Sequence, residues 1–142
     1  MNNLKWWFRI VGAFYLLLGV VWSPLVGVNA LMRQMYPNYD APVGGVADKL
    51  FYNVGGMLGF EWIVMGAFML YASREPAKHF SIVWLVVGYE ILRGIVDDLF
   101  LIAQGYPIAG YAAWIVVHLI IIVAGVTFVR RATAETANPL KA

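Results

Sequence analysis

The sequence predicts an all-α integral membrane protein, folded as a four-helix up-and-down bundle with both termini in the cytoplasm. Of its 142 residues, 62% are apolar and only 13% are charged, whereas soluble domains average about 45–50% apolar and about 25% charged residues. Four apolar runs each hold about 20 residues or more, the length at which a helix crosses about 30 Å of hydrocarbon. The length of the chain fits one domain, residues 1–142.

The first expected helix covers residues 8–28. Its basic start and apolar stretch resemble a secretion signal, but the run continues past the usual length of an apolar signal region. No small-x-small cleavage pattern precedes Pro24. We therefore expect a helix that is retained in the protein.

A long link, residues 29–49, separates the first two helices. Its two prolines and its Gly-Gly pair are typical of turns. It is also apolar enough to lie on the membrane surface or to cover the mouth of the bundle. Asp48 is suited to cap the N-terminus of the next helix.

The second expected helix covers residues 50–72 and carries closely spaced glycines. Gly55 and Gly59 form a GxxxG pair, which lets helix backbones approach closely in lipid. Such pairs are common, so packing inside the bundle is favoured over a dedicated dimer face.

Two further helices are expected over residues 80–103 and 108–129, with short links at 73–79 and 104–107. Gly105 suits the C-terminal cap of the third helix, and Pro107 suits the first turn of the fourth.

Lysine and arginine placement predicts the orientation, because basic residues in short loops stay in the cytoplasm. Of the basic residues other than Arg93, which lies within a helix, Arg33 and Lys49 fall on the outer side. Seven fall on the cytoplasmic side: Lys5, Arg9, Arg74, Lys78, Arg130, Arg131 and Lys141.

Charged and ionisable residues lie at membrane depth, where they are costly and commonly functional. At 1.5 Å per residue, the predicted spans bring four of them, from three helices, to roughly one level. These are Glu61, Glu90, Arg93 and His118, with Asp97 and Asp98 one to two turns further out.

The angular positions predict one inward stripe on the third helix. Glu90, Arg93 and Asp97 are spaced i, i+3, i+7, which places them within about 60° on an α-helix, whereas Asp98 is rotated by about 80° from Glu90. We therefore expect the stripe to face the bundle and Asp98 to lie nearer the outer water.

Charge balance distinguishes the explanations of this cluster. A buried ion pair that fixes helix packing is the structural explanation. Four acids, however, face one permanent cation, Arg93, and one histidine, His118. Protonation, hydration or a bound cation must offset the surplus, so a proton relay, a cation site and a polar-ligand pocket each remain open.

Metal and nucleophilic chemistry have little support in the sequence. A Glu-x-x-His pair, the spacing of carboxylate metal bundles, does not occur, and His79 lies at the opposite end from His118. We therefore name no metal ligand and no cofactor. The absence of cysteine excludes disulfides, thiolate nucleophiles and zinc-thiolate sites.

Three segments give a family resemblance: RIVGAFYLLLGVVW, GFEWIVMGAFML and YEILRGIVDDLFLIAQGY. They resemble the BphX-like family of small four-helix bacterial membrane proteins and, more distantly, DoxX-like proteins. The resemblance covers residues 6–130 and implies an inner-membrane location. It supplies no activity and no catalytic residue. The founding member's place among biphenyl-degradation genes suggests a role beside hydrophobic-compound metabolism, by analogy only.

These observations lead to competing functions. The first is binding of a hydrophobic or amphipathic small molecule by the polar cluster. The second is a structural or accessory role, as a homo-oligomer or within a larger membrane complex. The third is an intramembrane acid–base or metal-dependent enzyme, and proton-coupled transport is less favoured because four helices leave little room for alternating access. The expected surroundings are the lipid bilayer, and nothing in the sequence suggests binding to nucleic acid.

Overall fold

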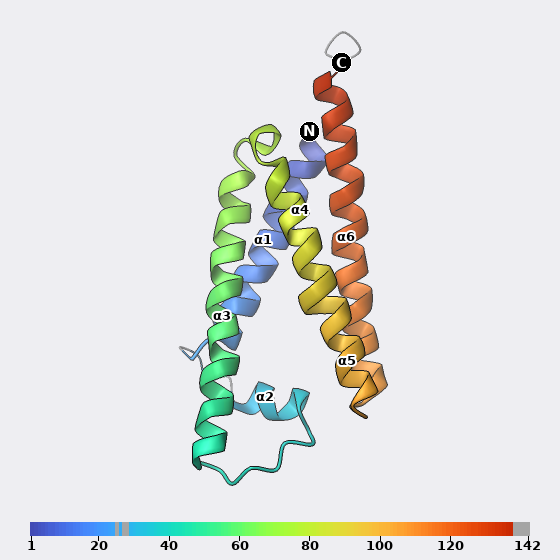
Figure 1. Ribbon diagram of the computed structural model, residues 1–142. Helices are drawn as coiled ribbons and strands as arrows, with labels where there is room; N and C mark the ends of the chain where they lie inside the picture. The colour runs from blue at the N-terminus through green and yellow to red at the C-terminus, as the bar shows by residue number, and fades with distance from the viewer. Residues whose placement is uncertain (25, 27–28, 138–142) are drawn as a thin grey trace. The chain divides into compact units, whose positions relative to one another are not determined.

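The computed structural model describes residues 1–24, 26 and 29–137. Within this part of the chain, the regular structure is entirely helical (Figure 1). The predicted end of the first helix at residue 28 and the basic residue Lys141 lie outside the described residues. Residue contacts group the chain into two units, one of Met1–Val11 with Met69–Ala142 and the other of Gly12–Phe68.

Three α-helices in the described residues are long and apolar enough to cross a membrane. They are α1 (Asn2–Trp22), α3 (Val46–Ala72) and α6 (Ile108–Ala137). This confirms an all-helical protein of membrane type. Helix α1 spans residues 2–22, whereas the sequence predicted 8–28, and α3 begins at residue 46, four residues before its predicted start. Helix α6 continues past residue 129.

The expected third span is helical but is not a single α-helix. It consists of α4 (Phe80–Tyr89), a π-helical segment η2 (Glu90–Val96) and α5 (Asp97–Ala103). The preceding link forms a short 3-10 turn, η1 (Pro76–Lys78). Four membrane crossings and cytoplasmic termini stay predictions.

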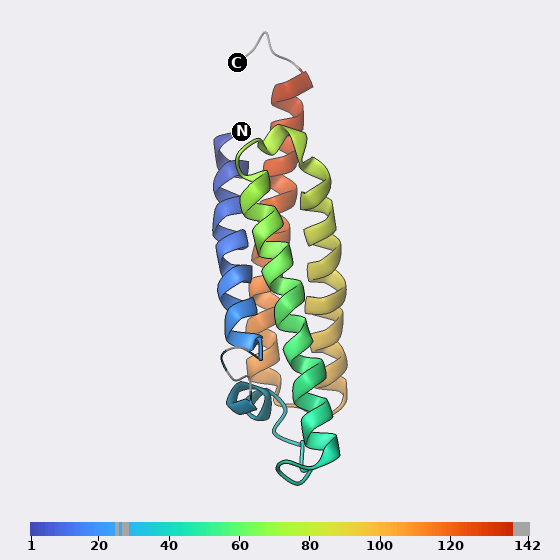
Figure 2. The ribbon, with the colours of Figure 1, turned by 90° about the vertical axis from the view of Figure 1, so that its left-hand side faces the viewer.

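In the first unit, the segment from α4 to α5 runs beside α6 (Figures 1 and 2). The two are joined by a tight turn in which Gly105 has φ +88°. Gly105 N–H donates to Ile102 O and Tyr106 N–H to Leu101 O, the two bonds of a Schellman cap. The predicted role of Gly105 is confirmed, whereas Pro107 precedes the first residue of α6.

The start of α1 packs on α6 within the same unit. The Trp7 indole donates a buried hydrogen bond of 3.1 Å to Ile121 O. A Cβ on Gly125 would lie 2.7 Å from the Trp7 ring, so the indole rests on a surface that only glycine leaves open. The first residue lies beside the end of α6, where the Met1 ammonium is 2.6 Å from a Glu135 oxygen.

In the second unit, α1 and α3 touch along their backbones. A Cβ on Gly59 would lie 2.6 Å from Ser23 N, and a Cβ on Gly66 would lie 2.6 Å from Gly12 O. The glycines therefore permit close helix packing inside the chain, as their spacing predicts.

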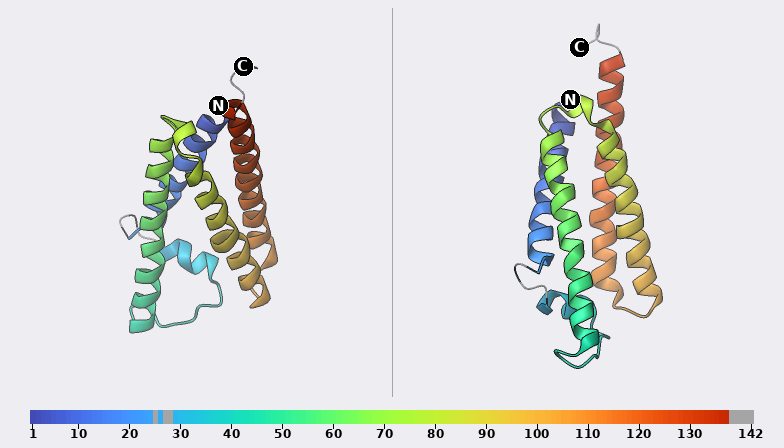
Figure 3. Two further views of the ribbon diagram at one scale, coloured as in Figure 1. Left: turned by 45° about the horizontal axis from the view of Figure 1, so that its top comes forward. Right: turned by 60° about the vertical axis from the view of Figure 1, so that its left-hand side comes forward.

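The link 29–49, predicted to consist of turns, contains a short helix, α2 (Asn29–Met35) (Figure 3). Met32 of α2 and Trp22 form a buried cluster with aromatic side chains of α3. Arg33 forms an ion pair of 2.5 Å with Asp48, which is 3% exposed.

Asp48 does not occupy the N-cap position, because α3 begins at Val46. It lies in the first turn and accepts a 2.7 Å hydrogen bond from Gly44 N–H, just before the helix. Its carboxylate therefore ties the preceding loop to the first turn of α3, where negative charge is favourable.

Candidate functional site

The site begins with the π-helical segment Glu90–Val96. A π-turn closes i→i+5 hydrogen bonds and so holds one residue more than an α-turn; such turns occur frequently at functional sites. One extra residue rotates every later side chain by about 100° relative to a continuous α-helix. This rotation decides which of the charged residues face α6.

Glu90 and Asp98 are the two acids that the segment turns inward. Glu90 is 2% exposed and Asp98 is 8% exposed. On an uninterrupted α-helix they would be about 80° apart, but the π-turn brings Asp98 to within about 20° of Glu90. The two carboxylates meet His118 on α6. We call Glu90, Asp98 and His118 the bridged-histidine cluster.

The imidazole of His118 lies between the two carboxylates. Its Nδ1 is hydrogen-bonded to Glu90 Oε2. Its Nε2 lies 3.7 Å from Asp98 Oδ2, within ion-pair range but beyond a normal hydrogen bond. One ring therefore connects two buried acids through both of its nitrogens.

Gly94 provides the surface against which the imidazole packs. A Cβ at this position would lie 2.5 Å from His118 Nδ1 and 2.6 Å from its Cγ. The Trp114 ring lies one turn away on α6, 6.2 Å from the imidazole centroid and inclined by 31°. The imidazole therefore lies against the backbone of η2 and near the indole of Trp114.

Arg93 and Asp97 occupy a different face, so the predicted inward stripe of Glu90, Arg93 and Asp97 is wrong. The side chains of Arg93 and Asp97 are 39% and 37% exposed and form an ion pair of 3.3 Å. The extra residue of the π-turn carries Asp97 away from the face of Glu90 and brings Asp98 onto it. Asp98 is thus a buried member of the cluster that faces His118, whereas the sequence predicted it to be rotated off the face of Glu90.

Glu61 lies on α3 in the second unit, where it is exposed. That Glu61 lies at the same membrane depth as Glu90, Arg93 and His118 stays a prediction.

Asp98 carries the unsatisfied polar atom of the site. Its Oδ2 is buried and accepts no hydrogen bond from any residue that the structure describes. Leaving a buried acceptor unpaired costs about 1–3 kcal/mol and more when the group is charged. The arrangement therefore has the capacity for one further donor at Asp98.

No group of three or more potential ligands suited to a metal ion occurs within the described part of the chain. The bridged-histidine cluster has the residue types but not the geometry, because its carboxylates approach opposite nitrogens of one ring. Donor atoms on two sides of an imidazole do not converge on a single ion. These three residues therefore do not supply the ligand set that a metal-dependent enzyme would need.

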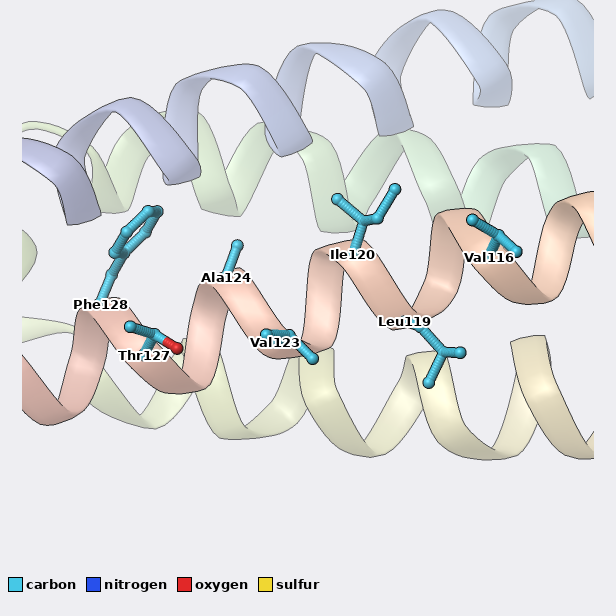
Figure 4. Close-up of a pocket in the computed structure, with 7 residues that line it drawn as sticks. All are labelled: Val116, Leu119, Ile120, Val123, Ala124, Thr127 and Phe128. Carbon is cyan, nitrogen blue, oxygen red and sulfur yellow. The ribbon is translucent and has the colours of Figure 1, made fainter.

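Helix α6 also bears an open, almost wholly apolar groove of about 500 Å³. Ile120, Ala124 and Phe128 point to one side of the helix in Figure 4, and Leu119 and Val123 point to another. Thr127 is the polar residue of its lining. The groove offers apolar contact without a polar anchor.

The three members of the cluster were predicted from the sequence, whereas Gly94 and Trp114 were not. Spacing to the cluster residues was the usable signal. Gly94 lies four residues from each acid, and Trp114 lies four residues before His118, a separation at which side chains on a helix are neighbours.

Comparison with known proteins gives one family. The family model described as BphX-like matches residues 1–135. Two similar proteins, from Burkholderia cepacia and Paraburkholderia xenovorans, are both described as uncharacterised BphX-like proteins. Each is 25% identical over 99 residues, which cover 68% of this chain and 69% of the relative. No solved structure matches.

Proposed function

We propose that this chain, which belongs to the BphX-like family, is a multi-pass protein of the bacterial inner membrane that binds a small amphipathic molecule at the bridged-histidine cluster. The apolar helices would hold the body of the molecule. Its polar group would meet Asp98 and His118.

The observation that carries this proposal is the buried, unpaired Oδ2 of Asp98. A carboxylate oxygen in apolar surroundings is stabilised by a donor, and a hydroxyl or ammonium group on a bound molecule supplies one. The His118 side chain is 20% exposed, so the imidazole is the accessible part of the cluster. Apolar sites with a few placed polar groups are typical of small-molecule binding.

Asp97 offers a matched control for Asp98, since the two acids are adjacent but only Asp98 faces His118. We would extract the protein with its native lipid in polymer nanodiscs and identify organic molecules by mass spectrometry. Asp98→Asn is expected to lose the bound molecule, and Asp97→Asn to retain it. Equal content in both variants, or a wild-type protein that carries bulk lipid alone, would contradict the proposal.

An accessory role in a larger membrane complex is the second candidate, and the groove on α6 favours it. The groove is open and almost wholly apolar, so another transmembrane helix could pack there as readily as lipid. Native mass spectrometry in gentle detergent tests this role. A solitary monomer under those conditions would count against it.

A further inference from the structure

We propose that His118 relays a proton between Asp98 and Glu90. The relay uses the same three residues as the proposed binding site but does not require a bound molecule. It adds an activity to the site, the transfer of a proton from α5 toward the middle of the segment that α4, η2 and α5 form.

The geometry gives each ring nitrogen its own carboxylate. Nδ1 is already hydrogen-bonded to Glu90, and Nε2 lies 3.7 Å from Asp98 Oδ2. A shift of less than about 1 Å would bring the second contact into hydrogen-bond range. Chains of Asp, Glu and His within transmembrane segments are the groups from which proton relays are built.

The transfer balances without another reactant. A protonated Asp98 gives its proton to Nε2 of a neutral imidazole whose Nδ1 carries hydrogen. The imidazolium then releases the Nδ1 proton to the Glu90 carboxylate. Asp98 ends as a carboxylate, Glu90 as a carboxylic acid, and His118 as the other neutral tautomer.

The neighbouring charges leave this path open. Arg93, the cation on the same segment, is paired with Asp97 on an exposed face. Asp98 forms no ion pair with a lysine or arginine of the described residues, so no permanent positive charge holds it as a carboxylate. From α6, the titratable group that faces it is His118.

The placement of the acids gives the relay a direction. Asp98 lies in the first turn of α5, five residues before its end, whereas Glu90 lies near the middle of the segment 80–103 and is 2% exposed. A proton that reaches Asp98 from the end of α5 would thus pass toward the buried middle.

Time-resolved infrared spectroscopy on protein reconstituted in vesicles tests the relay after a light-driven pH drop. The readout is the carbonyl stretch of protonated Glu90, assigned by its disappearance in Glu90→Gln. Protonation of Glu90 is expected to slow by about a hundredfold in His118→Gln. It should keep its rate in Asp97→Asn. An unchanged rate in His118→Gln would overturn the relay.

A second measurement leaves the cluster intact and so does not depend on the folding of its variants. The chain has two histidines, so His79→Gln leaves His118 as the sole source of imidazole nitrogen signals in NMR. Both neutral tautomers, in exchange, are the expected result. A single fixed tautomer across the pH range would exclude transfer through the ring.

The two proposals at this site fail separately. A protein that carries the small molecule but shows one fixed tautomer loses the relay and keeps the binding function. A protein that relays protons but carries no molecule loses the binding function and keeps the relay.

Discussion

At the residue scale, the position of His118 depends on Gly94. The ring lies where any side chain at 94 would begin, with 2.5 Å between an added Cβ and Nδ1. A methyl group there must displace the imidazole or separate η2 from α6. Glycine is therefore required at this position by its neighbour, not by its backbone conformation.

Gly94→Ala is expected to lower the free energy of unfolding by about 1–3 kcal/mol, the usual cost of overpacking. Gly88 is the control, because a Cβ on it meets nothing within 4 Å. Gly88→Ala should be neutral or stabilise by about 0.5–1 kcal/mol, since alanine is the better helix former. Unfolding in detergent, followed by circular dichroism, would measure both. Equal stability of the two variants would show that the ring does not rest on Gly94.

The residue types of the bridged-histidine cluster were predictable from the sequence, but which of these residues contact one another was not. Buried acids and a histidine in apolar runs are visible in the sequence because their desolvation is costly. Their pairing depends on a rotation that hydrophobicity does not encode, since exposed residues such as Leu92 and buried ones such as Val86 are equally apolar. Arg93 was assigned to the wrong face for this reason.

At the element scale, the π-turn behaves as a one-residue insertion. Without it, Asp98 would lie seven residues after Glu90, about 20° away on an α-helix. Removing one residue from η2 should therefore keep the two acids on one face. Removing one residue from α4 should instead rotate the start of that helix by about 100° relative to Glu90.

Deletion of Leu92 is thus expected to be tolerated better than deletion of Leu85. Both leucines are exposed, at 67% and 59%, so loss of buried surface does not separate them. The Leu85 deletion turns the fully buried Val83 away from its contacts. Thermal unfolding in detergent would compare the deletions. A lower midpoint for the Leu92 deletion would contradict the insertion account.

The long helices were largely predictable, because runs of about 20 apolar residues are unambiguous. Helix α2 was not, since seven residues between turn-forming segments carry little periodic signal. Its packing on α3 depends on contacts made by Met32 and Arg33, which become recognisable only once both helices are placed.

At the scale of the whole molecule, the number of membrane crossings decides the sidedness of the termini. If residues 80–103 cross together with α1, α3 and α6, both ends of the chain lie on one side. If that segment does not cross, the ends lie on opposite sides. The charge placement predicts four crossings.

The chain has no cysteine, so single-cysteine variants report sidedness directly. A membrane-impermeant maleimide should label Asn3→Cys and Thr136→Cys in inside-out vesicles. Ala41→Cys, in the predicted outer link, should be labelled in intact cells after opening of the outer membrane. Labelling of Asn3→Cys and Thr136→Cys from opposite sides would establish three crossings.

The indole beside His118 has a photophysical consequence. Trp114 lies 6.2 Å from the imidazole, centroid to centroid, and a protonated imidazole quenches an excited indole at such range far better than a neutral one. The emission of Trp114 should therefore dim whenever His118 carries its second proton. With the other five tryptophans replaced by phenylalanine, the fluorescence intensity of Trp114 would report the protonation state of His118.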